Sequence, residues 1–232
     1  MKPSKQFIKA DAIKWLEKNK GLGSVIASPP DAEEVGLNIV EWIDWFENAT
    51  EKTLLATKKD TPTIFMVTDR KHDKQVISKA NMIFKVAYKL NYKLQFHKIA
   101  LRLPLGTHDI FRPAYTHVLA FITVNNAKDV NVQGSDVFHR GKTIYKDATG
   151  IDAAIRMVKY AGSFSDTIVN PFSGSGTICH IAEKYGFNSI GIEILESQID
   201  LANSLEKLNV PLASSILNQP FICMLTGSPP YL

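Results

Sequence analysis

A strand, a glycine-rich turn, a helix and a second strand follow one another over residues 166–194, and this run constrains the fold more than any other part of the chain. The first strand reads DTIVNPF, the turn SGSGT, the helix ICHIAEKYG and the second strand NSIGIEI. Two strands joined by a crossover helix pair in parallel and need a sheet covered by helices. We therefore expect an α/β protein whose parallel strands are covered by helices.

The glycine turn carries the first chemical signal. Gly174 and Gly176 lie between a strand and a helix, where missing side chains let a ligand reach backbone amides at the helix N-terminus. Glu193 ends the next strand, where a carboxylate can accept hydrogen bonds from both hydroxyls of a ribose. Together they indicate a site for an adenosine-containing cofactor. The alternative is an ordinary tight turn of an α/β fold.

Composition narrows the class of protein. The chain has 232 residues, 45% of them hydrophobic, which suits one compact domain. Its net charge of +4 is spread along the chain, so it permits a polyanionic partner and equally fits a solvated basic surface. The two cysteines and six histidines show no metal-ligand spacing, so we expect no metal, no disulfide and a reducing intracellular setting. No apolar stretch approaches the roughly 18 residues of a membrane span, and no targeting signal is recognisable.

Periodicity alternates between strand-like and helix-like segments. Strands are predicted over 6–10, 24–28, 61–69, 92–102 and 115–124, and helices over 11–21, 35–57, 73–91, 149–162 and 195–209. In the helix over 73–91, Lys79, Lys85 and Lys89 are expected in solvent. The polar segment 125–147 is longer than most connections and is predicted to be a substrate-binding loop. We expect a single domain over 1–209 and a C-terminal tail over 210–232.

The stretch SVIASPPD ends a strand abruptly at Ser28, Pro29, Pro30 and Asp31. Proline has a fixed φ and no N–H, so this turn offers only carbonyl groups in a stiff arrangement. Ser28 adds a hydroxyl oxygen. The end of this strand is therefore predicted to present hydrogen-bond acceptors.

These two stretches resemble the motifs of one family. DTIVNPFSGSGT followed by GFNSIGIEI is similar to the S-adenosyl-L-methionine (AdoMet)-binding motif of the DNA amino-methyltransferases, and SPPD is similar to their catalytic motif. The catalytic motif comes first, as in the permuted group of this superfamily, and the resemblance extends to about residue 209. It is closest to a branch with Ser-x-Pro-Asp at the catalytic site. It implies a Rossmann-like class I methyltransferase fold with a mixed, seven-stranded, permuted sheet and helices on both of its faces.

The resemblance also implies an activity and a set of site residues. The activity is transfer of a methyl group from AdoMet to an exocyclic amino group of a base in DNA or RNA. The catalytic residues would be Ser28, Pro29, Pro30 and Asp31, which hold acceptors against the amine and draw its lone pair toward the methyl group. The cofactor-binding residues would be Asp11, Thr149, Gly150, Asn170, Pro171, Phe172, Gly174, Gly176, Thr177 and Glu193, with Asp11 at the adenine amine.

Asp31 departs from the family, which usually has an aromatic residue there to stack on a base rotated out of a duplex. Either Phe138, Phe111 or Tyr115 supplies that ring, or the substrate is not a base flipped out of a duplex. Asp31 could instead accept from the target amine, or it could only cap the next helix. The loop 125–147 is small for a recognition region. Phe138, His139 and Arg140 are its predicted substrate-binding residues, with Lys142 as a further phosphate contact.

Other functions stay open at this point. The chain could methylate a protein or small-molecule nitrogen, or it could be a catalytically weak AdoMet-binding subunit that supports an active partner. A nucleotide-dependent dehydrogenase is disfavoured because its fingerprint carries three glycines in G-x-G-x-x-G. We expect a nucleic acid as partner, either DNA or a structured or single-stranded RNA, with a homodimer or a partner subunit as further options. The expected location is intracellular, in the cytoplasm or, in a eukaryote, the nucleus.

Overall fold

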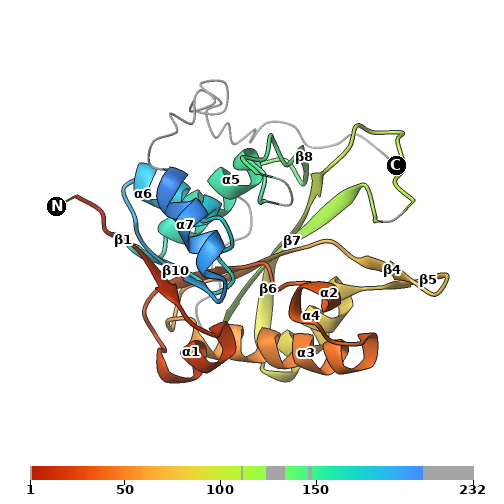
Figure 1. Ribbon diagram of the computed structural model, residues 1–232, viewed down its shortest axis with the longest axis horizontal. Coiled ribbons are helices and arrows are strands. Elements are labelled where there is room, and N and C mark those ends of the chain that lie inside the picture. Colours follow the sequence, from red (N-terminus) through yellow and green to blue (C-terminus); the bar gives the residue numbers. More distant parts are fainter. Residues whose placement is uncertain (1, 111, 124–133, 146–147, 206–232) are drawn as a thin grey trace, which may run out of the picture.

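The computed structural model describes residues 2–110, 112–123, 134–145 and 148–205. Figure 1 shows a central sheet between two helical layers. One layer holds α1 (Ala12–Lys18), α3 (Ile39–Ala56) and α4 (Lys79–Lys89), and the other holds α5 (Ile151–Gly162), α6 (Thr177–Lys184) and α7 (Glu196–Ser204). The short α2 (Ala32–Val35) follows the second strand. Within the described residues, no helix is long and apolar enough to span a membrane.

The main sheet has the strand order β1-β10-β9-β2-β3-β7-β6-β8. Its strands are β1 (Lys5–Lys9), β2 (Ser24–Ala27), β3 (Thr63–Val67), β6 (Tyr92–Leu101), β7 (Tyr115–Thr123), β8 (Val137–His139), β9 (Thr167–Asn170) and β10 (Asn188–Glu193). Strand β7 runs antiparallel to β3 and β6, and the other neighbouring strands are parallel. The sheet is therefore mixed, as expected, with a single reversed strand.

Each face of the sheet has its own hydrophobic core. On one face Trp42 and Phe46 of α3 pack with Phe65 and Phe121 of the sheet, all fully buried. On the other face the apolar side of α5 packs against β2, β3 and β9. Because both faces are covered, β2 and β3 are buried along their whole length, which explains their largely apolar sequences.

The predicted mixed sheet with helices on both of its faces is confirmed, and two local predictions are wrong. Within the predicted loop 125–147, Val137–His139 forms β8, an eighth strand parallel to β6. Because β8 has only three residues and only one inward side chain, its sequence shows no alternation of apolar and polar residues that would predict a strand. The helix predicted over 73–91 begins only at Lys79, because β4 (Arg70–His72) and β5 (Gln75–Ile77) form a hairpin that turns at Asp73 and Lys74, both with positive φ. The predicted tail lies outside the described residues.

Candidate functional site

The predicted site residues come together at the carboxyl ends of neighbouring strands. Ser28 follows β2 and Pro171 follows β9, and these two strands are adjacent and parallel. From β9 the chain crosses through α6 to β10 on one side, whereas β2 leads to β3 on the other, so the strand order switches between β9 and β2. Ligands of doubly wound sheets bind at such a switch point.

Glu193, at the end of β10, is fixed by backbone amides. Its Oε2 accepts a hydrogen bond from the Gly174 N–H at 2.9 Å, and its Oε1 accepts from the N–H groups of Ile194 and Leu195 at 2.8 and 2.9 Å. These bonds join the glycine turn to the acid at the end of the adjacent strand. The carboxylate is held where the sequence predicts contact with a ribose.

The two glycines of the turn serve different purposes. Both have positive φ, 49° for Gly174 and 80° for Gly176. A Cβ on Gly176 would lie 2.6 Å from Phe7 and 2.9 Å from Ala202, whereas a Cβ on Gly174 would have nothing within 4 Å. Gly176 is therefore required by packing, and Gly174 leaves open space beside the turn.

Three buried oxygens along the turn lack hydrogen-bond partners. They are Asn170 Oδ1, Ser173 Oγ and Thr177 Oγ1. A buried polar atom without a hydrogen-bond partner lowers the stability of the fold by about 1–3 kcal/mol. Three such atoms in one short turn therefore indicate a bound polar ligand that supplies the missing partners. Asn170 and Thr177 were predicted to contact the cofactor. This unsatisfied set, with the open space at Gly174, fits the polar parts of AdoMet.

The other predicted cofactor residues occupy varied places. Asp11 is the N-cap of α1 and accepts from the Lys14 N–H at 2.9 Å, and the neighbouring Ala10 N–H bonds to the Glu193 carbonyl, so Asp11 stands beside Glu193. The remaining four have packing contacts. Pro171 is buried, Phe172 packs edge-on against Trp45, Thr149 is half-buried, and Gly150 caps α5 so close to Arg140 that a Cβ would lie 2.2 Å from its carbonyl oxygen.

The catalytic turn presents acceptor groups as predicted from its sequence. Ser28 is exposed, and its hydroxyl donates to the Met66 carbonyl at 2.9 Å. Since the single proton is used in that bond, the oxygen lone pairs are left for an outside donor. Pro29 is buried, and the carbonyl of Pro30 accepts from the indole N–H of Trp42 at 3.1 Å. The turn is stiff and anchored to α3.

Asp31 is the N-cap residue of α2 and forms a capping box with Glu34, whose carboxylate accepts from the Asp31 N–H at 2.6 Å, and the Asp31 carboxylate is also used in ion pairs. It contacts the ammonium of Lys79, and Arg112 lies 3.7 Å away. The prediction that Lys79 is solvated is therefore wrong: its side chain is 5% exposed. As the first residue of α4 it lies where the helix meets the catalytic turn, and helical periodicity alone does not reveal that neighbour.

The three aromatic candidates near Asp31 differ in accessibility. Phe138 is 8% exposed, packs into the core and is covered by the Arg156 guanidinium at 4.6 Å, so the proposal that it stacks on a base is not supported. Tyr115 begins β7 at the same sheet edge as Ser28 and is 37% exposed. Phe111 lies outside the described residues.

His139 and Arg140 come at the end of β8, at the sheet edge that also holds Ser28. His139 is exposed, and the Arg140 N–H bonds to the Leu101 carbonyl at 3.0 Å. They stand at the far end of that edge, beyond β3, β7 and β6.

Sequence reasoning missed a chain of polar groups next to the site, which is buried at Asp69 and His117 and exposed at His97. Asp69 Oδ2 lies 3.2 Å from His117 Nε2, and His117 Nδ1 lies 2.8 Å from His97 Nε2. Burial opposes ionisation of Asp69, but bonds from His117, Ala80 N–H and Ser78 prevail and lower its pKa below the ordinary value. The three residues are far apart in sequence, and only the pairing of β6 with β7 and β7 with β3 brings them together.

Comparison with known proteins agrees with this geometry. Residues 140–204 match the family described as DNA methylase. The predicted resemblance to the DNA amino-methyltransferases is confirmed. The DNA methylase segment, residues 140–204, holds β9, the glycine turn, α6, β10 and Glu193, and this match supports an enzyme of the N-methyltransferase type. No curated protein matches the sequence.

Solved structures share the fold over most of the chain. The PvuII DNA methyltransferase (cytosine-N4-specific) is 15% identical, with a TM-score of 0.71 over 93% of this chain and 90% of its own. A candidate DNA modification methylase from Thermus thermophilus is 16% identical, with a TM-score of 0.69 over 89% of this chain and 97% of its own. The same protein complexed with S-adenosyl-L-methionine has a TM-score of 0.67 and 16% identity over 86% and 92%. At this identity the likeness describes the fold.

Proposed function

We propose that this protein transfers a methyl group from AdoMet to an exocyclic amino group of a base in DNA. The observation that carries the proposal is the position of Ser28, an exposed hydrogen-bond acceptor at the end of β2. It lies beside the glycine turn that follows β9, where buried oxygens lack hydrogen-bond partners. The DNA methylase segment and the resemblance of SPPD to the catalytic motif support the same activity.

The residues at the ends of β9, β10 and β1 would hold the cofactor. Glu193 faces the ribose hydroxyls, Asp11 faces the adenine amine, and the buried oxygens of Asn170, Ser173 and Thr177 gain the partners they lack. AdoMet supplies an electrophilic methyl group when bound. The Thermus thermophilus protein of the same fold is known in complex with this molecule.

The catalytic turn would act by holding the acceptor. The amino group of adenine or cytosine is a poor nucleophile because its lone pair is delocalised into the ring. Ser28 can accept a hydrogen bond from one amine N–H without giving up its own bond to the Met66 carbonyl. The bond to Ser28 draws the amine lone pair toward the methyl group. Placing the two bound reactants in line supplies most of the acceleration. No strong base is needed for the transfer.

The direct test is transfer of labelled methyl groups from AdoMet to unmethylated genomic DNA, total RNA and cell protein in parallel. We expect label in DNA, recovered after digestion as N6-methyladenine or N4-methylcytosine. Label in RNA alone or in protein alone would reject DNA as the acceptor. Label in none of the three would reject the proposed activity.

A second candidate function rests on Asp31. Because the family's aromatic residue is absent there, the chain could instead be an AdoMet-binding subunit that needs a partner. That function predicts AdoMet binding without transfer, and transfer once a co-purifying protein is added. A homodimer and an intracellular location also stay predictions.

A further inference from the structure

We propose that Lys79 is a positioning residue of this site. Its buried ammonium orients Asp31 so that one carboxylate oxygen accepts a hydrogen bond from the amine that is to be methylated. The inference rests on the proposed methyl transfer, and it assigns the binding of the amine to Asp31 together with Ser28. Neither the sequence motifs nor the family match includes Lys79.

The first observation is the burial of the ion pair. The side chains of Lys79 and Asp31 are 5% and 15% exposed, and the ammonium contacts Asp31 Oδ1. An ammonium removed from water needs a compensating charge, because breaking one partner of a buried pair leaves the other uncompensated. The orientation of the Asp31 carboxylate is therefore set by the lysine and not by solvent.

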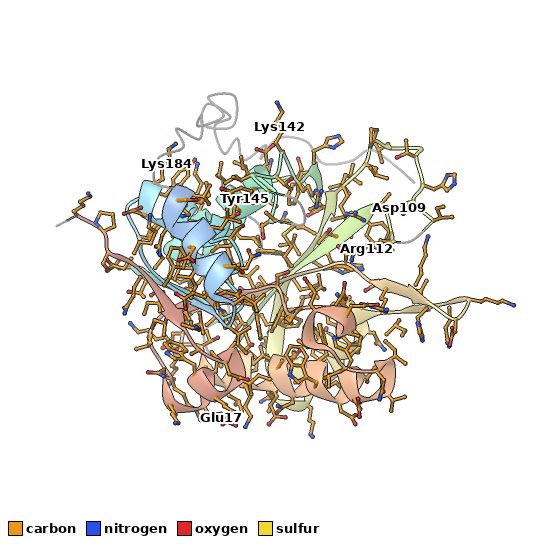
Figure 2. All side chains as sticks on the ribbon, in the orientation of Figure 1. Glu17, Asp109, Arg112, Lys142, Tyr145 and Lys184 are labelled. Carbon is orange, nitrogen blue, oxygen red and sulfur yellow. The ribbon has the colours of Figure 1, made fainter. Side chains whose placement is uncertain are left out.

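The second observation is the state of the other carboxylate oxygen. Arg112 lies 3.7 Å from Asp31 Oδ2, which is beyond hydrogen-bond distance, and its side chain is 49% exposed. Figure 2 shows Arg112 beside Asp109, above the hairpin that carries β4 and β5. Within the described residues, Oδ2 thus keeps the capacity to accept an N–H from a substrate.

The third observation is that the lysine belongs to one packed unit with the catalytic turn. Its ammonium lies 5.6 Å from the Trp42 ring and 5.9 Å from the Phe46 ring. Trp42 in turn donates its indole N–H to the Pro30 carbonyl. Lys79 therefore supports both Pro30 and Asp31, two of the four residues of the turn.

The backbone of Lys79 is also fixed. Ser78 caps α4 by accepting from the Asn81 N–H at 3.2 Å, and Asp69 Oδ1 accepts from the Ala80 N–H at 3.4 Å. The first turn of α4 is thus tied to the end of β3, next to β2. The backbone of Lys79 is therefore held at a fixed place relative to the catalytic turn.

The kinetic test compares three variants. Lys79→Met keeps the length of the side chain and removes the charge, Lys79→Arg keeps the charge, and Lys85→Met is the control, an exposed lysine of the same helix paired with Glu47. We expect Lys79→Met to lower kcat for methyl transfer roughly 100-fold, the effect of a displaced reacting group, with AdoMet affinity unchanged. Lys79→Arg should recover part of the rate. An unchanged kcat in Lys79→Met, or an equal loss of AdoMet binding, would overturn the inference.

A spectroscopic test is independent of activity. The indole N–H signal of Trp42, assigned with Trp42→Phe, should move in Lys79→Met and stay in Lys85→Met. Asp31→Asn should lower the melting temperature, and Lys79→Met in the same chain should restore part of it, because the uncompensated charge is gone. Additive losses with an unmoved indole signal would reject Lys79 as a positioning residue. If the indole signal moves and the double variant recovers melting temperature as expected, but the wild type transfers no methyl group, the proposed methyl transfer would be rejected instead.

Discussion

At the scale of single residues, the hydroxyl of Ser28 shows how a local bond determines a chemical role. Its proton is committed to Met66, so towards a substrate the oxygen acts only as an acceptor. An amine held by this oxygen must present its own N–H, and this orientation exposes its lone pair to the methyl group.

Replacing Ser28 should therefore separate chemistry from cofactor binding. We expect Ser28→Ala to reduce kcat by about 10- to 100-fold, while the Kd for AdoMet stays within about twofold. Ser163→Ala is a matched control, because Ser163 is exposed and also donates to a carbonyl, that of Tyr160 at 2.8 Å. Measurements of the transfer rate and of AdoMet binding on both variants would test this separation. A parallel loss of both quantities in Ser28→Ala would make the residue structural.

Glu193 should have the opposite signature. Binding of AdoMet raises the melting temperature by mass action, and Glu193→Ala should reduce that shift because the ribose contact and the tie to Gly174 are both lost. Glu17→Ala is the control, a carboxylate of α1 paired with Lys52 at the lower edge of Figure 2. Equal AdoMet shifts in Glu193→Ala and wild type, or a shift with NAD instead, would contradict the assignment.

At the scale of elements, the glycine turn combines a packing requirement with a ligand requirement. Gly176 admits Phe7 of β1, and Gly174 borders open space. Gly176→Ala should lower the free energy of unfolding by about 2–4 kcal/mol, from the strained φ and the overlap with Phe7. Gly174→Ala should cost only about 1 kcal/mol, from φ alone, yet weaken AdoMet binding. Denaturant unfolding and AdoMet titration of both variants would test this, and equal stability losses would contradict it.

The α2 helix is tied to the β4–β5 hairpin by a bidentate ion pair between Glu33 and Arg70. The hydrogen bonds from Arg70 lower the pKa of Glu33 from 4.5 to about 2. Since the folded pKa is below the unfolded one, the pair stabilises the fold above pH 4.5 and loses this effect as the pH falls toward 2.

Glu33→Gln should therefore lower the melting temperature at about pH 6 and match wild type near pH 2. The Glu33 side chain is 66% exposed, so the difference at the higher pH should be no more than about 1 kcal/mol. Thermal unfolding of both proteins across this range is the measurement. A difference that persists at the acid end would mean that the glutamine disturbs packing and not charge.

At the scale of the whole molecule, the net charge of +4 suits a polyanionic partner, and the sheet edge that holds the site defines where it would bind. Lys142 is exposed just past β8 on this edge, and Figure 2 shows its side chain directed outward. Lys93 is also exposed but lies near the start of β6, at the opposite edge.

Binding to duplex DNA should weaken with salt in proportion to the phosphates contacted. We expect Lys142→Ala to lower the magnitude of the slope of log K against log[salt] by about one, and Lys93→Ala to leave it unchanged. Fluorescence titrations at several salt concentrations would measure both slopes. Equal slopes in all three proteins would remove the segment after β8 from the DNA-binding surface.

The sequence by itself determined the fold class, the order of the two motifs and most of the residues at the switch point. These features are local: a glycine turn, a proline turn and the periods of strands and helices depend on neighbours in the chain. The positions of Glu193 beside Gly174 and of Ser28 beside the glycine turn followed from parallel pairing alone.

Only the tertiary structure decided what Asp31, Lys79 and the Asp69–His117–His97 chain do. Each of these side chains finds its partner on another element, and no periodicity encodes such a contact. A lysine at the start of a helix reads as solvated until its neighbours are known. It is buried here because packing α4 against α3 places its ammonium between two aromatic rings and a carboxylate, whose attraction compensates for the loss of water.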